Sequence, residues 1–169
     1  MKWLLLLPLL LLAVPAQAAD RFPDVPVRNL ARQETRLPAA FTHDLNVVFV
    51  VFSRKQQEEV ESWIPLFTEV GKERTDLQYW QASLMGEMGK VLRGIVEGAM
   101  RGAIKEKDRR ARFFLLYGDE APILAGLGDP DDQHLLMLLT ARDGTILWRA
   151  SGAHSQEAED ALRSVLASR

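Results

Sequence analysis

The alternation of apolar and polar positions is clearest between residues 46 and 70. Val47 to Phe52 is an unbroken run of β-branched and aromatic residues, which predicts a strand buried on both faces of a parallel sheet. Ser53 can cap a following helix, whose apolar positions recur at helical spacing, at Val60, Trp63, Ile64, Phe67 and Val70. The pattern therefore predicts a central strand, a tight turn and an amphipathic helix.

Shorter patterns on both sides of this unit predict a mixed α/β domain. Two apolar-polar stretches, Val27 to Leu30 and Glu34 to Leu37, are typical of an N-terminal β-hairpin. The other predicted elements are strands at Leu77 to Leu84, Phe113 to Tyr117, Leu135 to Thr140 and Thr145 to Ala150, a short helix at Ala121 to Leu127, and a terminal helix capped by Ser155.

The segment from Leu84 to Lys107 has the periodicity of a long amphipathic helix inserted between two strands. Its apolar face carries Leu84, Met88, Val91, Leu92, Ile95, Val96, Ala99 and Ala103, and its polar face carries Lys90, Arg93, Glu97 and Arg101. Gly94, Gly98 and Gly102 form a smooth strip along one border of the apolar face. Another backbone could approach the helix closely along this strip.

Two interpretations of the inserted helix remain open. An inserted helix of an α/β domain usually covers one side of its own sheet. Alternatively, the flexible side chains of Met85, Met88 and Met100, together with the glycine strip, form a docking site for a partner or a membrane. Because each interior glycine costs roughly 0.5–1 kcal/mol relative to alanine, the helix needs something to pack against it.

Residues 1–18 have the features of a secretory signal peptide. Lys2 precedes an apolar run from Trp3 to Val14, and Ala16-Gln17-Ala18 is a small-residue cleavage signature. The run is shorter than the roughly 20 residues that a membrane-spanning helix needs. We therefore expect residues 19–169 to form one domain that is exported to the periplasm. The formal net charge of −2 gives no support to a nucleic-acid partner.

The unit that ends in Phe52 and contains Pro65 resembles the centre of a thioredoxin-like domain. Counting from these two landmarks puts the redox cysteines of that family at Gln57 and Val60. The chain contains no cysteine, so the thiolate chemistry of the family cannot occur. The family's cis-proline, next to which an extended substrate binds the backbone edge, is replaced by Gln133-His134-Leu135. The resemblance implies a three-layer α/β sandwich with a mixed sheet, an N-terminal β-hairpin and the inserted helix.

Among thioredoxin-like proteins, the chain resembles the mitochondrial ATP-synthase assembly factor family, a diverged thioredoxin- and peroxiredoxin-like group. The shared features are Phe22-Pro23, Trp63 within the central unit, Met100-Arg101-Gly102, Tyr117-Gly118, and Ile146 to Gly152. None of these features is a catalytic signature. Members of the family help a membrane subunit of the synthase to assemble, but the signal sequence implies another compartment and therefore another partner.

The pattern indicates no catalytic residue, no metal site and no cofactor. His43, His134 and His154 lack the short spacing of zinc ligands. Arg54 and Gln57 lie where the predicted helix begins, and free backbone amides there could contact an anion or a peptide carbonyl. A plain surface turn is the alternative.

These observations favour an exported, non-redox binding protein. We expect an assembly or chaperone-like factor for a protein of the cell envelope, with membrane association left open and without nucleic acid or a small-molecule cofactor. The alternative is a diverged thioredoxin- or peroxiredoxin-like enzyme that uses non-thiol chemistry. The absence of cysteine and of the cis-proline favours binding.

Overall fold

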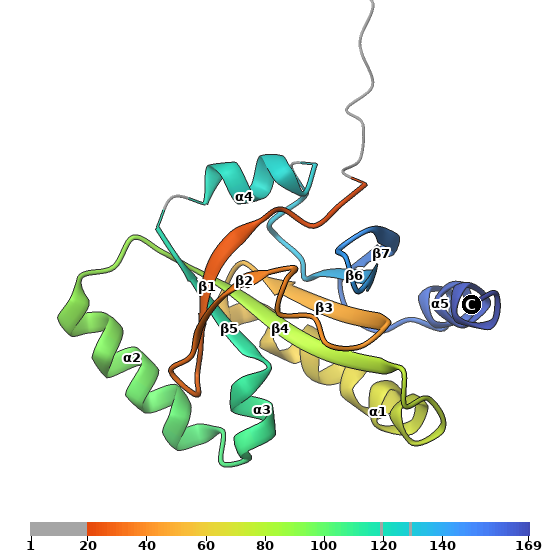
Figure 1. The fold of residues 1–169 in the computed structure, drawn as a ribbon, viewed down its shortest axis with the longest axis horizontal. Helices are drawn as coiled ribbons and strands as arrows, with labels where there is room; N and C mark the ends of the chain where they lie inside the picture. Colours follow the sequence, from red (N-terminus) through yellow and green to blue (C-terminus); the bar gives the residue numbers. More distant parts are fainter. Residues whose placement is uncertain (1–19, 119, 129) are drawn as a thin grey trace, which may run out of the picture.

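A mixed β-sheet runs through the computed structural model, which describes residues 20–118, 120–128 and 130–169. The predicted signal peptide lies outside this range. The strands are β1 (Val25–Asn29), β2 (Glu34–Leu37), β3 (Leu45–Val51), β4 (Leu77–Gly86), β5 (Phe113–Tyr117), β6 (Leu136–Ala141) and β7 (Ile146–Ser151). They form a 7-stranded sheet in the order β2-β1-β5-β4-β3-β6-β7 (Figure 1).

The central strand is β3, as the sequence predicts. It pairs in parallel with β4 and antiparallel with β6, and all its residues are buried. β5 continues the parallel part of the sheet, whereas β1, β2 and β7 add antiparallel strands at the two sides. The expectation of an α/β thioredoxin-like fold with an N-terminal hairpin is confirmed.

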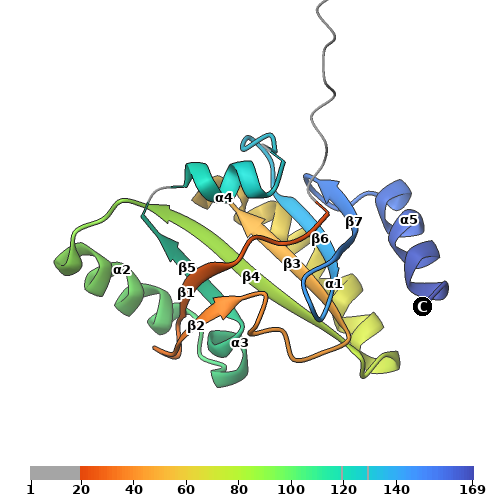
Figure 2. The same cartoon turned by 45° about the horizontal axis from the view of Figure 1, so that its top comes forward.

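Five α-helices accompany the described part of this sheet (Figure 2). They are α1 (Gln57–Glu73), α2 (Lys90–Ala103), α3 (Lys107–Ala111), α4 (Ala121–Gly126) and α5 (Gln156–Ala167). Ser155 caps α5 as predicted, because its side-chain oxygen accepts a hydrogen bond from the backbone N–H of Ala158 at 3.2 Å. Pro65 lies inside α1.

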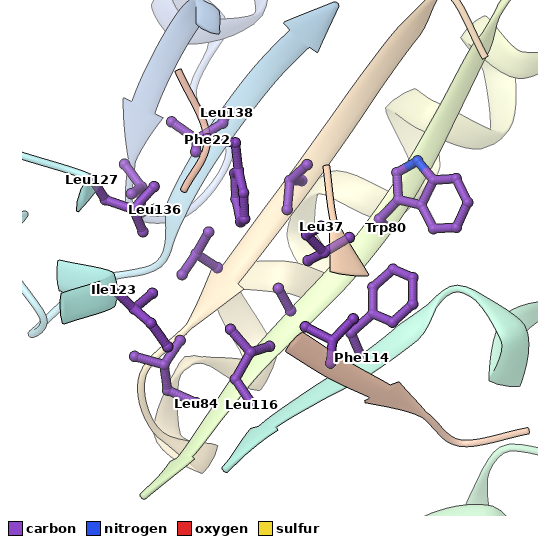
Figure 3. Packing of buried hydrophobic residues seen from close by; sticks show 14 of the residues in the cluster. Phe22, Leu37, Trp80, Leu84, Phe114, Leu116, Ile123, Leu127, Leu136 and Leu138 are labelled. Carbon is purple, nitrogen blue, oxygen red and sulfur yellow. The ribbon is translucent and has the colours of Figure 1, made fainter. Parts of the chain in front are cut away.

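Two apolar clusters hold the layers together. On one face of the sheet, Trp63 and Phe67 of α1 and Leu162 of α5 pack against Phe49 and its neighbours. On the other face, Ile123 of α4 packs with residues of the strands and of the N-terminal segment (Figure 3). The labelled side chains in that view are Phe22, Leu37, Trp80, Leu84, Phe114, Leu116, Ile123, Leu127, Leu136 and Leu138.

The inserted helix is present, but the bounds predicted for it, Leu84 to Lys107, are wrong at both ends. β4 continues to Gly86 and pairs with β5, so Leu84 is a buried strand residue opposite Leu116. α2 begins only at Lys90 and ends at Ala103, and α3 is a separate turn of helix. The apolar positions before Gly89 match a helical period by coincidence, because a strand end and a helix follow one another closely here.

The first helix also begins later than predicted. Ser53 precedes a 3₁₀ turn, η1 (Arg54–Gln56), and α1 starts at Gln57. The buried face of α1 contains Val60, Trp63, Phe67 and Val70, as its periodicity predicts. The resemblance puts the family's cysteines at the start of α1, next to this turn, and the turn is therefore the first part of the candidate site.

Candidate functional site

The turn between β3 and α1 carries no thiol. Arg54 is exposed, and Val60 is buried in the core beside Trp63. Gln57 is half-buried, with its Oε1 accepting a hydrogen bond from Gln81 Nε2 at 3.4 Å. The two positions that correspond to the family's cysteines therefore hold an amide and a packed valine. The chain cannot carry out thiol redox chemistry with its own residues.

Two other side chains connect this turn to the segment before β6. Gln56 is buried, and its Oε1 accepts hydrogen bonds from the backbone N–H of Phe52 at 2.8 Å and of Ser53 at 3.3 Å. Its Nε2 donates to the backbone oxygen of Asp132 at 2.8 Å. One amide side chain therefore joins the turn to a loop 76 residues away.

Glu59 makes a second connection to the same segment. Its Oε2 accepts a hydrogen bond from the backbone N–H of Leu135 at 2.7 Å, and its Oε1 lies 3.0 Å from Nδ1 of His134. These are backbone positions of the edge that the resemblance associates with an extended substrate. Because Gln56 and Glu59 already bond to it, this edge is partly occupied by the protein's own side chains.

The Glu59 carboxylate raises the pKa of His134 above its usual value of 6.5, first through their hydrogen bond and then through charge attraction. The contact between protonated His134 and Glu59 therefore stabilises the folded protein. This stabilisation is fully present below the pKa that His134 has in the unfolded chain, and it is lost as pH rises through the higher pKa that His134 has in the folded protein. We expect Glu59→Gln to lower the pKa of His134, as measured by NMR titration with His134→Gln used to assign the resonance. An unchanged pKa would contradict the contact.

The outward side of α2 is apolar. Val91, Leu92 and Ile95 are 81%, 52% and 64% exposed. Gly98, Ala99 and Gly102 are also exposed, and helical spacing places all six residues on one side of α2. We call these six residues the outer face. In Figure 1, α2 lies at the left of the molecule, beyond β1 and β5.

The glycines of α2 are not required by packing inside the described structure. A Cβ atom built at Gly94, Gly98 or Gly102 would meet no atom within 4 Å apart from its neighbours and the helix backbone. Glycine lowers helix stability by about 0.8–1.0 kcal/mol relative to alanine at interior positions. No contact inside the described structure therefore requires these residues to be small.

The inward side of α2 carries the charged residues. Glu97 is only 5% exposed, and its carboxylate accepts hydrogen bonds from Tyr117 Oη at 3.2 Å and Arg101 Nη1 at 3.4 Å. Arg28 Nη1 of β1 lies 4.0 Å from the same carboxylate. Burial and then the nearby Glu97 carboxylate raise the pKa of Tyr117 to about 12. The polar face of α2 therefore points toward the protein, and Glu97 on it is buried.

The methionines do not lie on the outer face. Met85 and Met100 pack against a small cluster formed by Leu30, Phe113 and Leu115, and Met88 is half-buried before α2 begins. The predicted binding residues are thus divided: Gly98 and Gly102 are on the outer face, whereas Gly94 lies on the border toward β1. Their binding roles, and that of Arg54 and Gln57, stay predictions. The sequence does not single out Val91, Leu92 and Ile95 as binding residues, because periodicity identifies an apolar face without saying which way it points.

Two further properties concern the described part of the chain alone. In residues 20–118, 120–128 and 130–169, no three histidine or acidic side chains gather in a way that could hold a metal ion. Over the same residues, no helix combines the length and the apolar character needed to cross a bilayer.

No protein-family model and no curated protein matches the chain. Solved structures do. The chain is similar to BsSco, described as a member of the Sco family of cytochrome c oxidase assembly proteins, with a TM-score of 0.58 and 13% identity over 88% of this chain and 93% of that one.

Two further solved structures are comparable. The pneumococcal exposed lipoprotein thioredoxin Etrx1 from Streptococcus pneumoniae has a TM-score of 0.56 and 12% identity, over 86% of this chain and 99% of that one. A putative thiol:disulfide interchange protein DsbE from Chlorobium tepidum has a TM-score of 0.55 and 12% identity, over 89% and 96%. At such identities the likeness establishes the thioredoxin-like fold and nothing more.

Proposed function

We propose that this chain is an exported, non-redox binding protein that acts as an assembly or chaperone-like factor for a protein of the cell envelope. The observation that carries the proposal is the outer face of α2, where Val91, Leu92 and Ile95 are mostly exposed. A contiguous apolar surface of this kind is typical of an interaction site. The turn that would hold cysteines in a redox relative offers no thiol, and Gln56 and Glu59 beside it bond to the protein itself.

The shape of the outer face favours an apolar helix as the partner's contact element. Gly98 and Gly102 lie four residues apart and leave the surface flat, so another helix backbone can approach closely. Ile95 lies beside them on the same side and supplies apolar contact area. In membrane proteins, helices that carry small residues four positions apart pack closely against one another. We therefore propose a membrane subunit of the envelope as the partner.

Two resemblances support assembly work without identifying the partner. BsSco, on the same fold, is described as a cytochrome c oxidase assembly protein. The sequence also resembles ATP-synthase assembly factors at Phe22-Pro23 and at Ile146 to Gly152. Both are arguments by analogy, because one fold serves many functions. Export rests on the predicted signal peptide at residues 1–18.

The Gly98→Leu variant tests the proposal, with Gly71→Leu as the matched control. Both glycines are exposed helix positions at which an added Cβ meets nothing within 4 Å, but Gly71 belongs to α1. Leucine is the better helix former, so neither change should lower the melting temperature by more than about 2 °C. We expect Gly98→Leu to reduce retention of the partner at least tenfold and Gly71→Leu to leave it unchanged, since only the first fills the outer face.

Retention is measured by quantitative mass spectrometry of proteins captured from envelope extract by wild type and by each variant. The supporting result is an envelope protein that wild type and Gly71→Leu retain and Gly98→Leu loses. Equal retention by all three forms would contradict a role for the outer face. If wild type binds protein-free lipid vesicles and Gly98→Leu does not, the outer face binds a bilayer and the proposal of a protein partner is wrong.

A further inference from the structure

A cleft of about 620 Å³ lies between the inward side of α2 and the β1–β2 hairpin. Its volume is within the range of small-molecule sites, roughly 300–1,000 Å³. Pro26, Leu115 and the ring of Tyr117 supply neutral wall, so an organic molecule finds apolar contact as well as charge there. The cleft is distinct from the outer face, which is on the opposite side of α2.

The cleft is strongly basic although the protein is slightly acidic. Five cationic side chains line it, Arg28, Arg32, Lys90, Arg93 and Arg101, against the two carboxylates of Glu34 and Glu97. The formal net charge of the whole chain is −2. The cleft is therefore locally positive in a protein whose net charge is negative. Glu97 is buried among Tyr117, Arg101 and Arg28 and offsets only part of it.

Two of the arginines are held in position and keep unused bonding capacity. The guanidinium of Arg93 lies 4.4 Å from the centre of the Tyr117 ring, and its Nε donates to the backbone oxygen of Met88 at 2.7 Å. The Nε of Arg28 is buried and has no hydrogen-bond acceptor among the described residues. A buried donor without an acceptor is uncommon. A bound anion would meet the exposed part of the Arg28 side chain, which is 41% exposed as a whole.

Arg32 occupies a backbone conformation that normally selects glycine. Its φ is 68°, and among the described residues other than glycine it is the one with a positive φ. Strained backbone of this kind costs on the order of 1–3 kcal/mol and is found at functional sites. The sequence thus keeps a cation at the mouth of the cleft where the local fold favours glycine.

From these observations we propose that the cleft binds a small organic molecule that carries a phosphate group. Guanidinium groups present paired N–H donors that match phosphate oxygens, and several of them around one cleft suit a group with more than one negative charge. The apolar wall holds the organic part. The phosphate belongs either to a free metabolite or to a lipid headgroup at a membrane surface, and the experiment distinguishes these sources.

The test uses the mature chain and glycerol 3-phosphate in isothermal titration calorimetry. The variant Arg32→Gly/Lys90→Gln removes two exposed cations of the cleft, and glycine at position 32 also suits the backbone. Lys72→Gln/Arg142→Gln removes two exposed cations elsewhere and is the matched control for overall charge. We expect saturable binding that weakens at least about tenfold in the cleft variant and less than about twofold in the control.

Several outcomes would overturn the proposal. The first is the absence of saturable binding at glycerol 3-phosphate concentrations up to about 10 mM, because a dissociation constant above that value is too weak for specific recognition. The second is an equal loss of affinity in the cleft variant and the control variant. The third is binding of citrate as tight as that of glycerol 3-phosphate. Vesicles of phosphatidylglycerol then identify the source. Sedimentation of the protein with these vesicles, reversed by glycerol 3-phosphate and lost in the cleft variant, assigns the site to a headgroup. Binding of glycerol 3-phosphate without sedimentation assigns it to a free molecule.

This inference does not depend on the proposed function. Gly98→Leu alters the outer face and leaves every charged residue of the cleft in place, whereas Arg32→Gly/Lys90→Gln does the opposite. Loss of partner retention with normal phosphate binding, or the reverse, therefore tells which of the two proposals has failed.

Discussion

Trp63→Ala is expected to lower the free energy of unfolding by about 3–5 kcal/mol. Trp63 is completely buried between α1 and the sheet, where its ring contacts Phe67 and meets the His154 ring edge to face at 4.9 Å. Its Nε1 donates to the backbone oxygen of Gly152 at 3.1 Å. Alanine would leave the Gly152 carbonyl without this donor and would leave a large cavity. The closely packed sheet cannot move in to fill that cavity.

Urea titration of wild type and variant measures this loss directly. Trp63→Phe is the control, because it keeps most of the ring volume and removes the hydrogen bond to Gly152, at a cost of about 1–2 kcal/mol. A loss below roughly 1 kcal/mol for Trp63→Ala would mean that the side chain is outside the core, where substitutions have small effects. The position would then become a candidate for binding.

Asn46→Ala should destabilise the protein by about 2–4 kcal/mol, although asparagine is a polar residue. Asn46 is fully buried within the central strand. Its Oδ1 accepts from Trp80 Nε1 at 2.8 Å, and its Nδ2 donates to the backbone oxygen of His43 at 2.7 Å. Alanine would leave both partners unpaired in the interior, and each such group costs about 1–3 kcal/mol.

A double-mutant cycle with Trp80→Phe separates the hydrogen bond from the packing. The phenylalanine side chain has no N–H to leave unpaired. Asn46→Ala should therefore lower the free energy of unfolding by at least about 0.5 kcal/mol less in the Trp80→Phe background than in wild type. The two free energies are obtained from urea titrations under the same conditions. Additive effects would show that Asn46 and Trp80 do not depend on one another.

The core of the fold could be predicted from sequence because its signals are local and strong. The run that contains Phe49 is too apolar for an exposed segment, and the spacing of Trp63 and Phe67 matches one face of a helix. Both predictions are confirmed. The boundary between β4 and α2 was missed because Leu84 fits a helical period equally well, and only the pairing of β4 with β5 decides the matter.

The candidate sites were harder to predict, for two different reasons. A helical period divides α2 into two faces but does not say which face points inward, and here the buried Glu97 opposes the usual preference for an apolar interior. The bonds of Gln56 and Glu59 join the turn to residues 76 positions away in each case, and no short-range pattern announces them. The absence of cysteine, in contrast, is visible in the sequence alone and excludes thiol chemistry.

The weak anchoring of α2 has a consequence for affinity. Met100 and Ile104, at the end of the helix, join the apolar cluster below, whereas the first turns are held by the ring and backbone contacts of Arg93. With glycines inside it, such a helix opens locally at a lower free energy than the sheet. The partner that we propose for the outer face would capture only the closed population, so its apparent dissociation constant would rise as that population falls. Substitutions that change the helix propensity of α2 without touching the proposed partner would therefore change how tightly it is held.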